Sequence, residues 1–275
     1  MQTILLHVQA DDRVDGRVED ALAIARSCGA FLDVVHITPD DVAAVYESFG
    51  GIDPDRAGQR NFEEAEDALE ARIRNELSNE DVQWDYTRVR GSTGHALASR
   101  AALSDLVVTG RLSHRSQSDR LALRIIGDLL VNTRAPVLIR GDEAQRFDPS
   151  APAVIAWDGS FEVANVVAMG LNLLRASDAV HVVRVTEGGE EVEPGLYPLT
   201  RVLSYLSRHG IKAEYSRIAE VDGKVVPALL GFAEEKGATM LATGAYTHSR
   251  IGQRFFGGVT RSLLKSCPIA LLMAH

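Results

Sequence analysis

The chain contains 275 residues, of which 45% are hydrophobic and 24% charged, as is ordinary for a globular protein of about two domains. No apolar run approaches the roughly 18 residues of a membrane-spanning helix, and the N-terminus lacks the basic and apolar regions of an export signal. We therefore expect a cytoplasmic protein without membrane contact. The two cysteines, Cys28 and Cys267, are expected to be buried thiols and not a disulfide.

The acidic excess lies entirely in the first half of the chain. Residues 1–143 contain 25 acidic and 16 basic side chains, whereas residues 144–275 contain 13 of each. The neutral second half is the better host for a polyphosphate. Nucleic acid is not expected as a partner, because neither half shows a basic stripe.

Short apolar runs alternate with amphipathic stretches along the first half. We expect strands at 3–8, 31–37, 82–89, 106–109 and 137–139, and helices at 17–28, 59–77, 93–103 and 121–131.

The second half repeats this order of elements. Strands are expected at 153–157, 179–185, 213–218, 240–243 and 269–272, and helices at 161–174, 197–208, 225–235 and 259–265. Thr-Gly with a His four residues later occurs at Thr109-Gly110 and again at Thr243-Gly244, and Pro136 and Pro268 each introduce a last strand. The polar stretch 141–151 is the natural linker. The predicted domains are residues 1–141 and 152–275.

Alternating strands and helices predict the α/β class: two tandem doubly wound, Rossmann-like parallel-sheet domains of five strands each. Ligands of such sheets bind beyond the carboxyl ends of the strands, where the strand order reverses. In the second domain this edge unites the stretch from Trp157 to Ser160, Val185 and the loop after Gly244.

The most informative stretch is the loop between Gly244 and Gly257-Gly258. Glycines at a strand–loop–helix junction allow backbone N–H groups to approach an anion, and a helix start adds unpaired donors and a positive dipole end. The layout is typical of a phosphate cradle, although an ordinary strand-to-helix connection looks the same.

The loop resembles that of the universal stress protein family, whose nucleotide-binding members carry G-x2-G-x9-G-[S/T] after the fourth strand. Gly244 fits the first position and Gly257 the third, while Thr247 replaces the second glycine and Gly258 the hydroxyl residue. The resemblance implies a stress-response protein that binds an adenine nucleotide (ATP, ADP or AMP), with or without Mg²⁺. Because single-domain members pair as dimers, it also implies an intramolecular pseudo-dimer, with a homodimer as a further option.

The resemblance assigns roles to residues of the second domain. Asp158 would lie beside the adenosine and the Val185 backbone would hold adenine, although Asp158 also fits a helix N-cap cluster and Val185 the core. The helix start that would face the phosphates consists of Gly257, Gly258, Val259 and Thr260. In the loop, His248 and Arg250 would screen the phosphate charge, and Thr247 occupies the position of the second family glycine. Thr260 could supply the hydroxyl that Gly258 lacks. His248 and Arg250 fit solvated surface equally well.

The first copy lacks these features, with Gln9 at the strand end and no glycine pair near residue 123. It is expected to be a structural partner. The sequence shows no catalytic signature and identifies no nucleophile with its base, so no enzyme activity is predicted. Two alternatives to nucleotide binding stay open: a protein that acts through protein or small-ligand interactions, and a weak nucleotide hydrolase.

Overall fold

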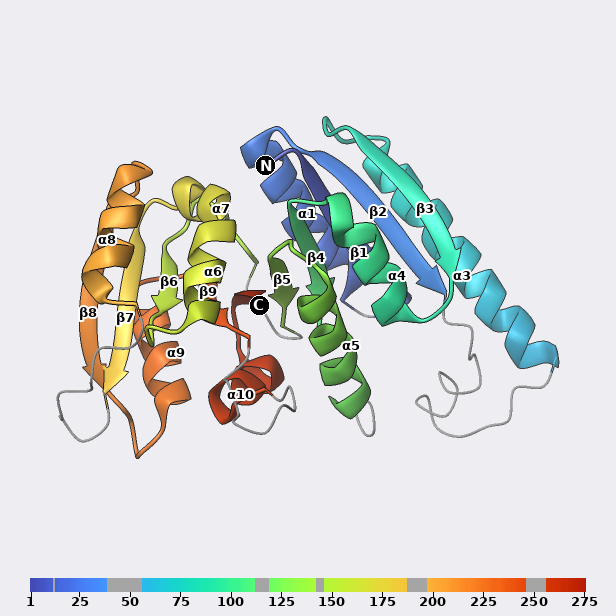
Figure 1. The fold of residues 1–275 in the computed structure, drawn as a ribbon. Helices are drawn as coiled ribbons and strands as arrows, with labels where there is room; N and C mark the ends of the chain where they lie inside the picture. Colours follow the sequence, from blue (N-terminus) through green and yellow to red (C-terminus); the bar gives the residue numbers. More distant parts are fainter. Residues whose placement is uncertain (12, 39–55, 112–118, 142–145, 187–196, 246–255) are drawn as a thin grey trace. The chain divides into compact units, whose positions relative to one another are not determined.

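The computed structural model describes residues 1–11, 13–38, 56–111, 119–141, 146–186, 197–245 and 256–275, without the side chains of 56–61, 119–122 and 124. The chain forms two compact units, Met1–Thr133 and Arg134–His275, each with parallel strands and covering helices (Figure 1). The predicted α/β class, with mostly parallel strands and covering helices, is confirmed. None of the described helices has the length and apolar character that crossing a membrane requires.

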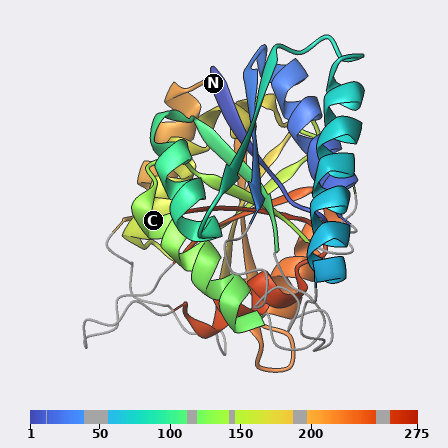
Figure 2. The same cartoon turned by 90° about the vertical axis from the view of Figure 1, so that its right-hand side faces the viewer.

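The first unit has four parallel strands in the order β3-β2-β1-β4. The strands are β1 (Thr3–Val8), β2 (Phe31–Thr38), β3 (Trp84–Arg90) and β4 (Leu106–Gly110); the helices are α1 (Val14–Cys28), α3 (Arg56–Leu77), α4 (Thr93–Arg100), the 3-10 helix η1 (Ala101–Leu103) and α5 (Asp119–Asn132). Figure 2 shows these strands between α1 and α3 on one side and α4 and α5 on the other. Because helices cover both faces, β1 and β4 are buried along almost their whole length, and each contains three consecutive apolar residues.

The second unit has six strands in the order β5-β10-β9-β6-β7-β8, all parallel except β5, which runs antiparallel to β10. The strands are β5 (Val137–Arg140), β6 (Ala153–Ala156), β7 (Val180–Thr186), β8 (Ala213–Ala219), β9 (Met240–Gly244) and β10 (Ala270–Ala274); the helices are α6 (Phe161–Met169), α7 (Leu171–Ala176), α8 (Leu199–Arg208), α9 (Val225–Glu235) and α10 (Gly258–Ser266).

The placement of β5 differs from the expectation of five parallel strands per domain. The last strands of the two copies pair with each other, so the units contain four and six strands. Strand β10 is wholly apolar and buried, and so are the first three residues of β5, whose last residue is Arg140. Pairing gives each strand a backbone partner along an edge that would otherwise be open.

The helix expected over 161–174 is interrupted at Gly170, between α6 and α7. A Cβ atom at this position would lie 2.6 Å from Cδ2 of Leu272 in β10, so the glycine allows the helices to pack closely on the sheet. Cys267 is buried as predicted, whereas Cys28 is only half-buried; both thiols are free.

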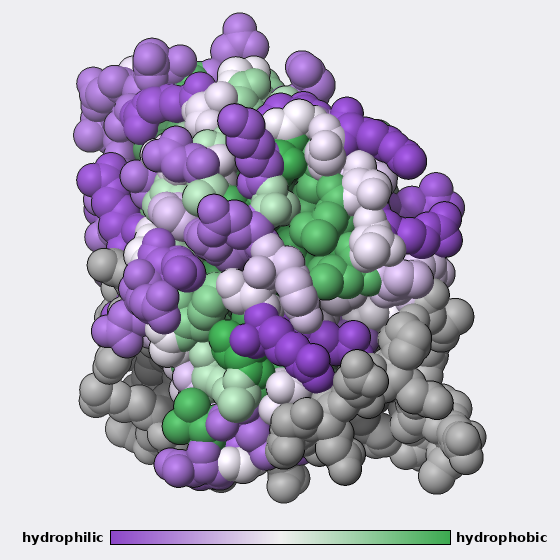
Figure 3. Space-filling model, turned by 90° about the vertical axis from the view of Figure 1, so that its left-hand side faces the viewer, coloured by the Kyte–Doolittle hydropathy of each residue, from purple (hydrophilic) through white to green (hydrophobic). Residues whose placement is uncertain are grey.

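Strand β8 forms the outer edge of the second unit, and its side chains alternate between half-buried and exposed positions over most of its length. This side of the molecule is covered largely by hydrophilic side chains with apolar patches between them (Figure 3). Glu214 and Arg217 on β8 place charges along the edge, which discourages pairing with another strand.

Candidate functional site

A cavity of about 320 Å³ lies at the carboxyl ends of β6, β7 and β9, which is the predicted edge of the sheet. Its lining includes seven of the ten predicted site residues: Asp158, Val185, Gly244, Gly257, Gly258, Val259 and Thr260. Thr247, His248 and Arg250 lie outside the described residues, and their roles stay predictions.

The N-terminus of α10 opens into this cavity without a cap. Gly257 is the N-cap residue and has no side chain to offer, and the first turn contains no acidic residue. The first intrahelical bond runs from the N–H of Arg261 to the carbonyl of Gly257 (2.9 Å), so the N–H groups of residues 258–260 have no acceptor within the helix. This end of α10 therefore offers backbone donors and a positive dipole to an anion.

Gly244 holds the other side of the cavity, and packing explains why it must be glycine. A Cβ atom there would lie 2.8 Å from Cβ of Glu162 and 3.0 Å from the backbone nitrogen of Val163 in the first turn of α6. The backbone of Gly244 also accepts a hydrogen bond from the Thr260 hydroxyl (3.4 Å), which ties α10 to the end of β9. Thr260 is thus buried and engaged within the protein.

Asp158 belongs to the turn that starts α6. Its Oδ1 accepts the N–H of Ser160 (2.9 Å), and the Ser160 hydroxyl accepts the N–H of Val163 (3.3 Å) as the N-cap of the helix. The capping interpretation of this cluster is correct for Ser160. The exposed Asp158 carboxylate is still part of the cavity wall, where it can accept hydrogen bonds from a ligand.

The backbone of Val185 faces the cavity because β6 ends before it can pair there. The N–H of Trp157 donates to the carbonyl of Val183 (2.8 Å), so Val183 points its backbone groups toward β6. The backbone N–H and C=O groups of successive strand residues point to opposite sides, so those of Val185 point in the same direction as those of Val183. Strand β6 ends at Ala156, so among the described strands the backbone groups of Val185 have no partner on that side. Val185 can offer an N–H and a C=O to a ligand.

The described lining also includes eight residues that were not among the predicted site residues: Ala156, Trp157, Ser160, Val183, Arg184, Val225, Leu229 and Thr243. Val225 and Leu229 on α9 supply an apolar wall, and Trp157 closes the end of β6. The indole nitrogen of Trp157 is buried and has no hydrogen-bond partner among the described residues. A tryptophan directly before the strand-end Asp158 was the available signal.

The family model described as the universal stress protein family matches residues 152–275. These residues are a universal stress protein domain. The resemblance to this family, which the glycine loop indicated, is confirmed.

The whole chain also has the fold of solved universal stress proteins. It is similar to one from Archaeoglobus fulgidus DSM 4304, with a TM-score of 0.67 and 15% identity over 99% of this chain and 95% of that chain. It is likewise similar to a protein from Pseudomonas aeruginosa UCBPP-PA14 classed with the universal stress proteins, with a TM-score of 0.60 and 13% identity over 100% of this chain and 93% of that chain. At these identities the likeness shows the fold alone. A search of curated proteins finds no match.

The first copy can be aligned with the universal stress protein domain through its strand register. Ile4 pairs with Leu106 as Ala153 pairs with Met240, which makes Gly110 the counterpart of Gly244. Beside Gly110 lies the guanidinium of Arg17, whose Nη1 would be 2.8 Å from a Cβ atom at that glycine.

Arg17 is held at the strand ends of the first copy by three contacts. Its Nη1 and Nη2 donate to the carboxylate of Asp11 (2.9 and 2.8 Å), and its Nε donates to the carbonyl of His7 (3.3 Å). Burial alone would raise the pKa of Asp11, but the hydrogen bonds and charge of Arg17 outweigh it and hold that pKa below its usual value. A buried ion pair thus occupies the strand ends of the first copy.

Proposed function

We propose that the universal stress protein domain at residues 152–275 binds an adenine nucleotide in the 320 Å³ cavity and that the chain acts in a stress response through this binding. The observation that carries the proposal is the uncapped N-terminus of α10, which faces the strand ends across a cavity of ligand size. Small-molecule sites typically measure about 300–1,000 Å³.

The start of α10 would hold the phosphates. Three N–H groups without intrahelical acceptors and the helix dipole favour negative charge, and the absence of a side chain at Gly257 and Gly258 allows oxygens to approach the backbone. No atom of the described residues lies within 4 Å of the Cβ position of Gly258, so these residues leave space beside it.

The opposite end of the cavity suits adenosine. The N–H and C=O of Val185 would pair with the adenine edge, as the family resemblance implies, while Val225 and Leu229 would contact the ring. The Asp158 carboxylate, which belongs to the cavity wall, would accept hydrogen bonds from the ribose hydroxyls. A Mg²⁺ ion bound with the nucleotide would be held chiefly by phosphate oxygens, with Asp158 as the carboxylate in the described cavity wall.

Binding would be confined to the second copy. In the first copy, the Arg17–Asp11 ion pair fills the strand ends beside Gly110, and opening this space would strip two buried charges of their partners. The uneven charge of the chain supports the same choice, because the first half carries the whole acidic excess.

The full-length protein should be titrated calorimetrically with ATP, ADP and AMP, alongside Gly257→Asp. The aspartate puts a side chain and a negative charge where phosphate oxygens would lie, so binding should be lost. Gly231→Asp makes the same change on the exposed side of α9, where no atom lies within 4 Å of the Cβ position, and should bind as the wild type does. Unchanged affinity in a folded Gly257→Asp variant would show that α10 does not hold the phosphates.

A second function is favoured by a specific observation at the same helix start. Gly258 lacks the family hydroxyl, and the hydroxyl of Thr260 already donates to Gly244. These two observations fit a domain that does not bind a nucleotide and acts instead through a protein or small-ligand partner. Mass analysis of the purified protein, with titrations that detect no adenine nucleotide, would select this alternative; phosphate release from ATP would instead select the weak hydrolase.

A further inference from the structure

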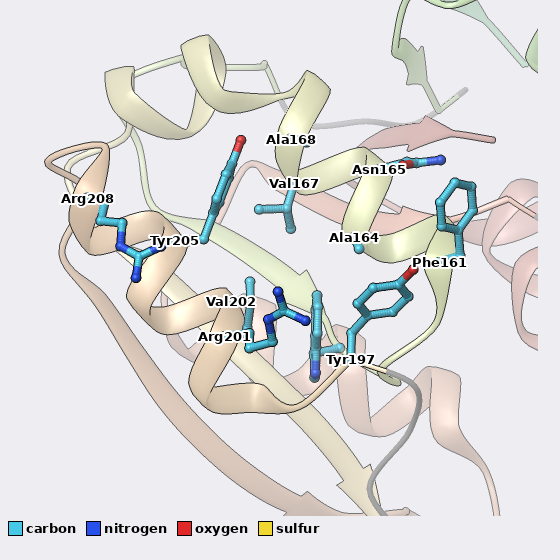
Figure 4. Close-up of a pocket in the computed structure, with 11 residues that line it drawn as sticks. Phe161, Ala164, Asn165, Val167, Ala168, Tyr197, Arg201, Val202, Tyr205 and Arg208 are labelled. Atoms are coloured by element: carbon cyan, nitrogen blue, oxygen red, sulfur yellow. The ribbon is translucent and has the colours of Figure 1, made fainter.

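A second cavity, of about 340 Å³, lies between α6 and α8 of the universal stress protein domain (Figure 4). Figure 4 shows side chains of α8, among them Val202 and Arg201, facing Val167 and Ala164 of α6 across it. Among the described lining residues, Trp157 is the one that this cavity shares with the first. The two cavities therefore open along different helices, α6 and α8 for one and α9 and α10 for the other.

The lining of the second cavity is cationic. Arg201 and Arg208 stand seven residues apart on α8, which places them on the same side of the helix, and both are exposed. Among the described residues neither guanidinium has an ion-pair partner, and no acidic side chain belongs to the described lining. An anion would therefore meet two positive charges on the described lining.

The lining is also aromatic. Tyr197 and Tyr205 flank Arg201 in sequence, and the rings of Phe161 and Tyr197 meet with centroids 6.4 Å apart. Phe161 is 50% exposed, which is unusual for so large an apolar side chain. Val167 and Val202 form the apolar floor, and both are buried. Aromatic and apolar side chains of this kind favour a ligand with a flat apolar ring over a purely polar ligand.

A third feature is the indole N–H of Trp157. The side chain is 4% exposed, and its nitrogen is buried without an acceptor among the described residues. A buried donor without a partner costs stability, and a ligand that provides an oxygen at this point would remove the cost.

We propose that the α6–α8 cavity is a second binding site, for small aromatic carboxylates. Arg201 holds the carboxylate, since the planar guanidinium fork matches a carboxylate with two parallel hydrogen bonds. Tyr197 and Tyr205 contact the ring, and Arg208 adds positive charge at the rim. The site is independent of the nucleotide site proposed above, because only Trp157 among the described residues takes part in both cavities.

The two tryptophans of the chain, Trp84 and Trp157, provide the measurement. In the full-length protein labelled with ¹⁵N, each gives one indole N–H signal, and Trp84→Phe identifies that of Trp157. Titration with 2-naphthoate should shift the Trp157 signal in a saturable way. The neutral 2-naphthamide should bind at least about tenfold more weakly, because it carries no charge and its single carbonyl oxygen cannot accept the two parallel hydrogen bonds of a carboxylate–guanidinium pair.

Variants locate the binding. Arg201→Gln should weaken 2-naphthoate binding by about tenfold or more, whereas Arg175→Gln, on the exposed side of α7 and outside the lining, should leave it unchanged. Gly257→Asp should also leave it unchanged, which separates this site from the nucleotide cavity. The proposal is overturned if 2-naphthoate causes no saturable shift, if Arg201→Gln binds as the wild type does, or if AMP is the ligand that requires Arg201.

Discussion

The same substitution at the two ends of the glycine loop should have opposite effects. In Gly244→Ala the new Cβ atom would lie 2.8 Å from Cβ of Glu162 and 3.0 Å from the nitrogen of Val163, both fixed parts of α6. Carbon atoms pack at about 3.5–4.0 Å, so the first turn of α6 must move by roughly 0.5–1 Å. Such overpacking costs about 1–3 kcal/mol of unfolding free energy.

At Gly258 no atom of the described part of the chain lies within 4 Å of the Cβ position, and the residue is not at positive φ. Gly258→Ala should therefore stabilise the protein by about 0.4–1 kcal/mol, because it reduces the freedom of the unfolded chain. Urea unfolding followed by circular dichroism measures both changes. With a slope of about 2 kcal/mol/M, a loss of about 2 kcal/mol lowers the midpoint by ~1 M.

The reasoning would be refuted if Gly244→Ala stayed within about 0.5 kcal/mol of the wild type, the range of ordinary surface substitutions. It would also fail if the two variants were destabilised equally. Either result would mean that α6 does not press on the end of β9 as the structure shows.

Three further predictions concern pH, a buried network and the loop. Burial, and then the charge of Arg17, lower the pKa of His7 to about 3. Between pH 6.5 and 3 the unfolded state thus binds a proton that the folded state does not. The free energy of unfolding should therefore fall by about 1.4 kcal/mol for each pH unit as the pH drops. In His7→Gln, urea unfolding between pH 6.5 and 4 should show a weaker dependence of this free energy on pH. Tyr86→Phe should cost about 1–3 kcal/mol in the same assay, since it removes the hydroxyl that contacts Nδ1 of the buried His36 (2.8 Å). Thr247→Gly with Gly258→Ser should tighten ATP binding by roughly tenfold or more, because a hydroxyl on a charged oxygen contributes about 1.5–3 kcal/mol; a flat calorimetric titration would mean that the cavity holds no triphosphate.

The sequence was sufficient for most elements and for the edge of the sheet where the site lies. Continuous apolar runs such as those of β1 and β4 can be buried only between two layers of helices, which defines the fold class. The rule that ligands meet the carboxyl ends of strands then brought Asp158, Val185 and Gly244 together, and the cavity contains all three.

Other features depend on contacts that the pattern does not encode. A short strand with only three apolar residues, such as Val137–Arg140, fits several positions in a sheet, and only the structure shows that it pairs with β10. The sequence suggests that Gly244 is a glycine because a phosphate approaches its backbone. In the structure, the first turn of α6 is what excludes a side chain at this position. The sequence pattern gives no indication that Arg17 is buried. An arginine can be buried only when a partner such as Asp11 and the shape of the surrounding strand ends allow it.

The antiparallel pairing of β5 with β10 has a consequence for any fragment of this protein. A fragment that begins at residue 152 would lack β5 and leave one side of the apolar β10 open to another molecule. Two such fragments could pair through β10 at high concentration and separate on dilution, as mass action requires. In the intact chain the partner strand is covalently linked, at an effective concentration of the order of millimolar, so β10 stays covered however dilute the protein becomes.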